Sequence, residues 1–357
     1  MHLASGITLL SGAAGIASLI LACCRSEVDT TSLIISTILG LFIRDIYPSL
    51  NNRAAGLAKV RKMINSVATD VPKDVSLLSI SIKNTAKEAL SLRLYRRQIK
   101  ESTIGGNVES NPSILRPVLI WFHGGGFVIG NFTNENTLCS KIVQHTDFIV
   151  VNVDYRLAPE NPFPAAVNDA AEVLQWARRS IAEYGGDPTK IYLSGESAGG
   201  TIATSVTALN QDPVFTSPAN KVEIKGLFVL YPCLDHGVYL DSHFRYSNSF
   251  PLLTLKQMQY FWSMYLTDQA VDAADYRACP MRTPDKFLKN FPRTLIVLAK
   301  HDILLDEGLK FGRRLINSKV PVETIVYDRM HHGFFAKGAN ETQTIEICKR
   351  LNDMVLK

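Results

Sequence analysis

The sequence lacks the patterns that mark disulfide, metal and phosphate sites. Its six cysteines show no close-spaced pairing, so no disulfide framework is indicated. The eight histidines show no metal-ligand spacing, and the glycine run 124–126 is not followed by the Lys and Ser/Thr of a phosphate loop. We therefore expect no cofactor and no metal ion.

A strong charge of one sign, internal repeats and long low-complexity stretches are also lacking. The formal net charge of +5 is modest and spread along the chain, so no nucleic-acid partner is expected. Basic residues are frequent over 44–62, where contact with anionic lipid is the better interpretation. No pattern indicates an oligomeric state.

The order of apolar segments predicts an α/β fold. From residue 117 onward, strand-like runs alternate with helix-like segments, which is typical of a mostly parallel sheet with helices on both faces. Segments 75–82 and 89–95 alternate in hydrophobicity and are expected to be antiparallel opening strands of the same sheet. The other expected strands are 117–122, 148–153, 190–194, 225–231, 293–299 and 322–328, with a helix over 165–183.

A serine pattern stands between one of these strands and a helix. Residues 195–199 read Gly-Glu-Ser-Ala-Gly, after the apolar run 190–194 and before the helix-forming run 201–209. A serine on such a sharp turn is exposed, and only small neighbours allow the turn. This context favours Ser197 as a reactive residue.

A second motif lies upstream in the order that acyl transfer requires. Residues 123–127 read His-Gly-Gly-Gly-Phe and follow the expected strand 117–122. Consecutive glycines let backbone N–H groups turn towards an incoming carbonyl oxygen, as in an oxyanion hole.

An acid and a histidine should follow the serine, each after a strand. Asp302 comes shortly after strand 293–299, and His331 and His332 follow strand 322–328. Asp306 and Glu307 compete with Asp302, but they open a helix, where carboxylates are commonly caps and dipole partners. We prefer Asp302, and we prefer His332 because the glycine after it leaves room for the ring.

The chain resembles the hormone-sensitive-lipase-like branch of the α/β hydrolases, which carry a helical cap over the sheet. The resemblance covers roughly residues 117–335. An apolar N-terminal segment makes arylacetamide-deacetylase-like enzymes the most similar group. The matching motifs are 123–126 (His-Gly-Gly-Gly), 154–160 (Asp-Tyr-Arg-Leu-Ala-Pro-Glu), 163–165 (Phe-Pro-Ala), 195–200 (Gly-Glu-Ser-Ala-Gly-Gly), 301–302 (His-Asp), 306–308 (Asp-Glu-Gly) and 332–334 (His-Gly-Phe).

The resemblance implies a role for each motif residue. Ser197 would be the nucleophile, His332 the base and Asp302 the acid that orients the base. The oxyanion hole would consist of the backbone N–H groups of Gly125, Gly126 and Ala198, with His123, Gly124 and Glu196 as supporting residues.

One motif position departs from the family. Glu196 stands where the family usually has Asp. Because the longer side chain keeps the charge, we expect altered local hydrogen bonding rather than lost activity. Asp154 and Arg156 are expected to form a buried pair that Asp169 joins, with a structural role.

The segment 234–290 interrupts the alternation of strands and helices and is dense in aromatic residues. We expect it to fold as a cap over the carboxyl ends of the strands, with most rings in its own core and a few lining an apolar pocket. Residues 48–74 are predicted to add an N-terminal cap piece, and 75–357 to form the catalytic domain.

Residues 1–47 are interpreted as a membrane anchor and a second apolar segment. Residues 3–24 contain no charged residue and are long enough to cross a bilayer. A cleaved signal peptide is the alternative, although the usual basic region is missing. The basic stretch favours a cytoplasmic catalytic domain, whereas the resemblance implies one in the endoplasmic reticulum lumen, which we prefer. Asn131 and Asn340 begin glycosylation triplets.

Together these features predict a serine carboxylic-ester hydrolase that acts on hydrophobic, short- to medium-chain acyl esters through an acyl-enzyme intermediate. Amide deacetylation and acyl transfer would use the same intermediate and are kept as alternatives. A non-catalytic receptor for a small ligand on the same fold fits less well, because His332 is present.

Overall fold

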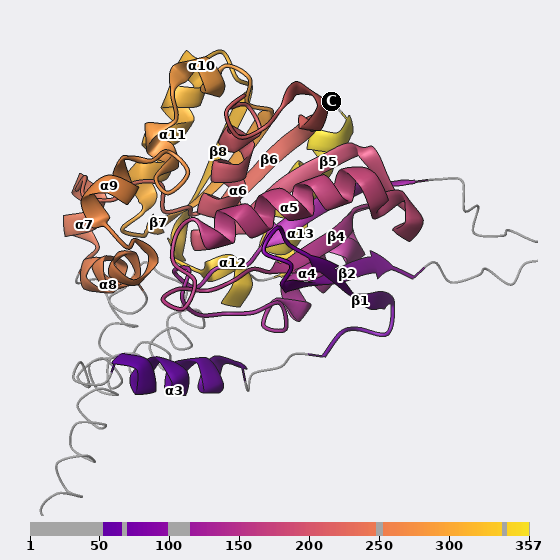
Figure 1. The fold of residues 1–357 in the computed structure, drawn as a ribbon, viewed down its shortest axis with the longest axis horizontal. Coiled ribbons are helices and arrows are strands. Elements are labelled where there is room, and N and C mark those ends of the chain that lie inside the picture. Colours follow the sequence, from indigo (N-terminus) through magenta and orange to yellow (C-terminus); the bar gives the residue numbers. More distant parts are fainter. Residues whose placement is uncertain (1–52, 66–69, 99–114, 248–252, 338–340, 357) are drawn as a thin grey trace, which may run out of the picture.

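An eight-stranded sheet forms the centre of the protein (Figure 1). The computed structural model describes residues 53–65, 70–98, 115–247, 253–337 and 341–356. The strand order is β1-β2-β4-β3-β5-β6-β7-β8. Its strands are β1 (Val75–Lys83), β2 (Ala89–Arg97), β3 (Arg116–Phe122), β4 (Ile149–Asp154), β5 (Gly186–Glu196), β6 (Ile224–Leu230), β7 (Arg293–His301) and β8 (Val322–His331).

The pairing of the strands confirms the predicted mostly parallel sheet. β1 pairs with β2, and β2 with β4, in antiparallel register. All pairs from β4 to β8 are parallel. Parallel neighbours end at the same edge of the sheet, so residues that follow β3, β5, β7 and β8 are brought together there.

The two faces of the sheet bury two separate sets of apolar side chains. On β3, Val118, Ile120 and Phe122 belong to the larger core, whereas Leu119 and Trp121 belong to the smaller one. This alternation explains why β3 is apolar at nearly every position, since a strand covered on both faces has no solvent side. The prediction of helices on both faces is thereby confirmed.

Within the described residues, one group of helices packs on the larger core and another group packs on the smaller one. The first group is α5 (Ala165–Ser180), α6 (Ala198–Leu209) and α11 (Leu305–Asn317), of which α5 and α6 lie in front of the sheet in Figure 1. The second group is α4 (Asn136–His145) and α13 (Glu341–Leu356), with the short α12 (Phe334–Lys337) beside them. Every residue of α6 is buried, which fits a helix that is apolar or small on all sides.

Some element boundaries differ from those expected. The helix expected over 165–183 is α5 followed by the 3₁₀ turn η2 (Ile181–Tyr184), which ends at Gly185 with φ 83°. Glycine adopts this left-handed conformation without a steric cost, so the helix stops there. β5 begins at Gly186, and β6 ends at Leu230, which leaves Tyr231 outside the strand.

Several short elements lie between β6 and β7, within the predicted cap segment 234–290. They are α7 (Asp241–Arg245), α8 (Leu255–Tyr265), α9 (Gln269–Ala274), η4 (Pro280–Arg282) and α10 (Asp285–Leu288), and η3 (Pro218–Asn220) precedes β6. In Figure 1, α7, α8 and α9 gather at one end of the molecule.

The described part of the predicted N-terminal cap piece contains one helix, α3 (Arg53–Asn65). Arg61 on this helix donates hydrogen bonds to the carbonyl oxygens of Val128 and Ala158 and to the carboxylate of Glu160. These bonds hold α3 against the segments that follow β3 and β4.

The expected pair of Asp154 and Arg156 is wrong. Within the described residues, the guanidinium of Arg156 contacts the buried Asp169 at 2.8 Å and Glu88 at 2.8 Å. Asp154 accepts a bond from the backbone N–H of Phe132 instead. Arg156 lies two residues after the end of β4, and its side chain reaches Asp169 on α5.

The predicted membrane anchor over 1–47 and the triplet at Asn340 lie outside the described residues. Among the residues that the structure does describe, no helix is both long and apolar enough to cross a membrane. Asn131 uses its side-chain oxygen to accept bonds from the backbone N–H groups of Thr133 and Asn134, which stabilises the turn after the glycine loop.

Candidate active site

Ser197 lies at the sharp turn between β5 and α6. Its backbone has φ 50° and ψ −122°, a conformation that costs free energy for a residue other than glycine and is common at functional sites. Gly199 lies so close to the backbone of Phe122 that a Cβ atom would overlap the carbonyl oxygen. Glycine at 199 is therefore required for α6 to begin against the end of β3.

His332 and Asp302 complete a chain of hydrogen-bonding groups with this serine. His332 Nε2 is 2.9 Å from Ser197 Oγ, and His332 Nδ1 is 2.8 Å from Asp302 Oδ2. If Nδ1 carries the proton, it donates to the carboxylate and leaves Nε2 to accept the serine proton. The three side chains come from the ends of β5, β7 and β8, and the parallel sheet brings these ends together.

Asp302 is held by its own turn as well as by the imidazole. Its side chain is fully buried, and Oδ1 accepts a bond from the backbone N–H of Leu304 at 2.9 Å. These two contacts restrict the rotation of the Asp302 carboxylate. The carboxylate therefore favours one orientation of the His332 ring.

The residues that competed for these positions lie elsewhere. His331 ends β8, and its Nδ1 contacts the carbonyl oxygen of His332. Asp306 accepts a bond from the backbone N–H of Ser242. Glu307 is buried and accepts bonds from the backbone N–H groups of Leu234 and Asp235. Within the described residues, neither Asp306 nor Glu307 bonds to Ser197 or His332.

The glycine loop after β3 lies beside the serine turn. Gly125 adopts φ 112°, and its carbonyl oxygen accepts bonds from the N–H groups of Val128 and Ile129. A Cβ atom at Gly125 would overlap the carbonyl oxygen of Ile129, so a side chain is excluded there. Among the described residues, the N–H groups of Gly125, Gly126 and Ala198 have no hydrogen-bond acceptor. These groups are available to an oxyanion.

His123 supports the loop rather than the chemistry. Its ring stacks on Tyr155 with centroids 4.2 Å apart, and its Nδ1 contacts the carbonyl oxygen of Gly124 at 2.7 Å. Burial lowers the pKa of His123 to about 4, so the ring is neutral at physiological pH. The hydroxyl of Tyr155 donates to the carbonyl oxygen of His123, which ties the loop to the segment after β4.

Glu196 is buried and directly precedes Ser197 in the chain. Its Oε2 accepts a bond from the hydroxyl of Tyr231 at 2.5 Å. A Cβ atom at Gly124 would be 2.7 Å from Glu196 Oε1, so the carboxylate also fills the space beneath the loop. The sequence predicts a strand over 225–231 and contains no local signal for this contact with Tyr231, which the structure places just after β6.

Aromatic rings of α8 cover the glycine loop. The ring of Phe261 packs directly on Gly126. Tyr265 stacks on Phe127 with centroids 3.8 Å apart, and Trp262 lies 5.4 Å from the same ring. The segment between β6 and β7 thus places an apolar surface over the loop that would receive a carbonyl oxygen.

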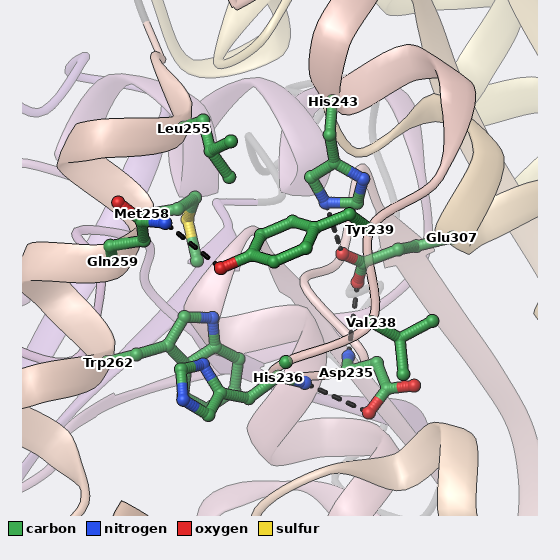
Figure 2. Close-up of a pocket in the computed structure, with 11 residues that line it drawn as sticks. Asp235, His236, Val238, Tyr239, His243, Leu255, Met258, Gln259, Trp262 and Glu307 are labelled. Carbon is green, nitrogen blue, oxygen red and sulfur yellow. Dashed lines mark hydrogen bonds and ion pairs between the residues drawn. The ribbon is translucent and has the colours of Figure 1, made fainter.

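A separate shallow cavity, partly open to solvent, lies between α8 and the segment after β6 (Figure 2). At its inner side, His243 Nε2 contacts Glu307 Oε1 at 3.0 Å, and both side chains are buried. Burial raises the pKa of Glu307, while the bond from His243 opposes this effect. Ser197 does not line this cavity.

No group of three or more metal-ligating side chains occurs within the described part of the chain. The described cysteines, Cys139, Cys233, Cys279 and Cys348, are all free and buried. Burial raises the pKa of the Cys139 thiol, so this thiol is poorly suited to act as a nucleophile.

Known proteins with similar sequences are hydrolases. The carboxylic ester hydrolase LipN of Mycobacterium tuberculosis is 33% identical over 219 residues, which cover 61% of this chain and 57% of that protein. An AB hydrolase superfamily protein of Schizosaccharomyces pombe is 33% identical over 62% of this chain and 64% of its own length. The chain therefore spans less than two thirds of these two relatives. The ethyl acetate hydrolase of Pseudomonas putida is 28% identical, with 76% of this chain and 78% of that protein covered.

Solved structures agree with the fold. A fungal esterase of Rhizomucor miehei has a TM-score of 0.72 and 26% identity, covering 84% of this chain and 90% of the other. A thermostable esterase of Pseudomonas putida has a TM-score of 0.72 at 24% identity, covering 84% and 89%, and shows the fold alone. A family described as the alpha/beta hydrolase fold matches residues 119–336, more than half of the chain. The chain therefore belongs to the alpha/beta hydrolase fold family.

Proposed function

We propose that this protein is a serine carboxylic-ester hydrolase with Ser197 as nucleophile, His332 as general base and Asp302 as the orienting acid. The observation that carries the proposal is the unbroken series of contacts from Ser197 Oγ through His332 to Asp302, at 2.9 and 2.8 Å. The names of the relatives, which include a carboxylic ester hydrolase and an ethyl acetate hydrolase, support the same reaction.

The reaction would proceed in two halves. Ser197 Oγ attacks the ester carbonyl while His332 Nε2 takes its proton, and the N–H groups of Gly125, Gly126 and Ala198 stabilise the oxyanion. The protonated imidazole then donates to the leaving alcohol, which breaks the ester bond and leaves the acyl group on Ser197. A water molecule repeats the attack and releases the acid. Asp302 stabilises the imidazolium in both halves.

The substrate would be a hydrophobic acyl ester of short to medium chain length. The apolar surface that α8 places on Gly126 supports this choice, because an acyl chain leaving the oxyanion hole would meet the ring of Phe261. Residues 234–290 would act as a cap over the site, with 48–74 as a smaller N-terminal part of it.

Hydrolysis of a p-nitrophenyl ester series from acetate to palmitate tests the proposal. The wild type should cleave the shorter esters, and Ser197→Ala should lose at least about a thousandfold in kcat. Ser205→Ala is the matched control, because the Ser205 hydroxyl donates to the backbone carbonyl oxygen of Thr201 in its own helix. Turnover by Ser197→Ala equal to that of the control would refute the assignment of Ser197 as the nucleophile.

The place of the protein in the cell is a second proposal. Residues 3–24 would anchor the chain in the endoplasmic reticulum membrane, with the catalytic domain in the lumen, because this run is long, apolar and free of charge. Protease treatment of intact microsomes should leave the catalytic domain whole. Digestion without detergent would place the domain on the cytoplasmic side instead.

A further inference from the structure

Tyr231 has a strained backbone and a fully buried side chain. It directly follows β6 and adopts φ 35°, which few non-glycine residues do. Its side chain is completely inaccessible to solvent. The backbone is held in place because the N–H of Tyr231 donates to the carbonyl oxygen of Val297 on the neighbouring strand β7 at 2.7 Å. Strain that a structure keeps at such a cost often serves a functional site.

The backbone conformation of Tyr231 places its side chain in contact with both His332 and Glu196. The ring lies edge-on to the imidazole of His332, with centroids 4.9 Å apart and planes at 62°. Its hydroxyl donates to Glu196 at 2.5 Å, and Glu196 is the residue before the nucleophile. Phe334 packs on the same tyrosine ring at 5.6 Å. Tyr231 therefore links the nucleophile's strand to the base.

We propose that Tyr231 is a positioning residue for His332 and that Glu196 fixes the tyrosine ring through its hydrogen bond. This inference rests on the proposed function. His332 must hold Nδ1 on Asp302 and Nε2 on Ser197 at the same time, so its ring plane has little freedom. The edge of Tyr231 restricts rotation of that plane, and the bond to Glu196 prevents the tyrosine from turning away.

The length of residue 196 matters to this arrangement. The glutamate carboxylate spans from the space under Gly124 to the hydroxyl of Tyr231. An aspartate is one methylene shorter and would not reach that hydroxyl without a shift of the backbone. Glu196 and Tyr231 thus act as one unit, in which the tyrosine contacts the base and the glutamate holds the tyrosine.

The test compares Tyr231→Phe with Tyr327→Phe. Tyr327 is a matched control, because it also packs on Phe334 and donates to a glutamate, Glu346 at 3.1 Å. Among the described residues, its ring makes no contact with His332. Tyr231→Phe should lower kcat by about tenfold or more with little change in KM, since small misplacements of catalytic groups are costly. The double variant Glu196→Gln/Tyr231→Phe should be no worse than Tyr231→Phe alone.

Active-site titration with a fluorophosphonate separates loss of folded enzyme from loss of turnover per site. If Tyr231→Phe matches Tyr327→Phe in kcat per titrated site while the wild type cleaves esters, the hydrogen bond from Tyr231 to Glu196 does not position His332 and the proposal is wrong, whereas the proposed function stands.

A second readout does not depend on catalysis. In protein with ¹⁵N-labelled histidine, the Nδ1–H resonance of His332 should broaden or shift in Tyr231→Phe and stay unchanged in Tyr327→Phe. An unchanged resonance in Tyr231→Phe would overturn the positioning role even if the wild type showed no esterase activity.

Discussion

In the described part of the chain, two buried carboxylates, Asp302 and Glu307, each bond to a histidine, and the two pairs differ in what their remaining atoms do. Asp302 bonds to His332 at 2.8 Å, and Glu307 bonds to His243 at 3.0 Å. Both carboxylates follow β7, and both imidazoles come from other segments. Only the first pair has an imidazole nitrogen in contact with a serine hydroxyl.

Every side-chain nitrogen and oxygen of His243 and Glu307 forms a hydrogen bond within the protein. The backbone N–H of Leu240 donates to His243 Nδ1, and Glu307 accepts two further bonds from the segment after β6. A buried pair of this kind joins α7, α11 and the end of β6, whereas the Asp302–His332 pair leaves one nitrogen for chemistry. A histidine–carboxylate contact therefore becomes a candidate catalytic pair only when one nitrogen meets a nucleophile.

The largest expected difference between the pairs is in activity. Asp302→Asn should lower kcat by roughly 10⁴, because the asparagine favours the wrong imidazole tautomer. Thermal unfolding should show that the variant is folded. Asp306→Asn, four residues on and bonded to Ser242 rather than to an imidazole, is the control and should stay within about tenfold of wild type. Equal losses in the two variants would contradict the assignment of the acid.

Glu307→Ala should affect stability more than catalysis. It leaves three donors without an acceptor, namely His243 and the N–H groups of Leu234 and Asp235, and should cost about 3–5 kcal/mol of unfolding free energy. Urea titration measures this change. Glu346→Ala, at an exposed carboxylate, should cost less than about 1 kcal/mol. A stable Glu307→Ala protein without esterase activity would show that the pairs had been interpreted the wrong way round.

His123 sharpens the comparison, because it is a buried histidine without a carboxylate. Its folded-state pKa of about 4 lies below the ordinary value, so the unfolded chain binds the proton first as the pH falls. The stability that neutral His123 contributes is present above about pH 6.5 and should be lost between there and pH 4, by about 3 kcal/mol. Denaturation of wild type and His123→Asn across this pH range measures the free energy of unfolding, which should fall less with acid in the variant. If the free energy of unfolding falls equally in both proteins, the role of His123 in acid stability is refuted.

The smallest effect is expected for Ser242, which bonds to residues between Asp302 and Glu307. The hydroxyl of Ser242 donates to the carbonyl oxygen of Ile303 at 2.7 Å and accepts from the N–H of Asp306. Ser242→Ala removes both bonds and should cost about 1–3 kcal/mol, with kcat within about threefold of wild type. A loss of kcat beyond tenfold without a loss of stability would mean that α7 positions Asp302 directly.

Most of the parallel sheet could be predicted from the sequence. Strands buried on both faces are short continuous apolar runs, and β3, β6 and β7 are of this kind, so they are conspicuous. The first and last residues of the strands were harder to predict from the sequence. β5 extends four residues earlier than the apolar run 190–194, to Gly186, which pairs with Arg116 on β3 although it is not part of an apolar run.

The contacts of polar residues were harder to predict. Arg156 bonds to Asp169 and Glu88, which are distant in sequence, rather than to Asp154 two residues away. Tyr231 looked like the last residue of a strand, yet its positive φ turns the side chain towards His332. Neither outcome has a local signal, because each depends on which segments the fold brings into contact.

The sequence by itself determined the α/β class, the glycine loop, the serine turn, and the order of the acid and the histidine along the chain. These features depend on local rules, namely the period of apolar residues and the backbone freedom of glycine. Only the tertiary structure decided which carboxylate faces which histidine, since Asp302 and Glu307 both follow β7 and both are buried. The parallel strand ends bring Asp302 to His332 and Ser197, while the turn of α11 directs Glu307 to His243.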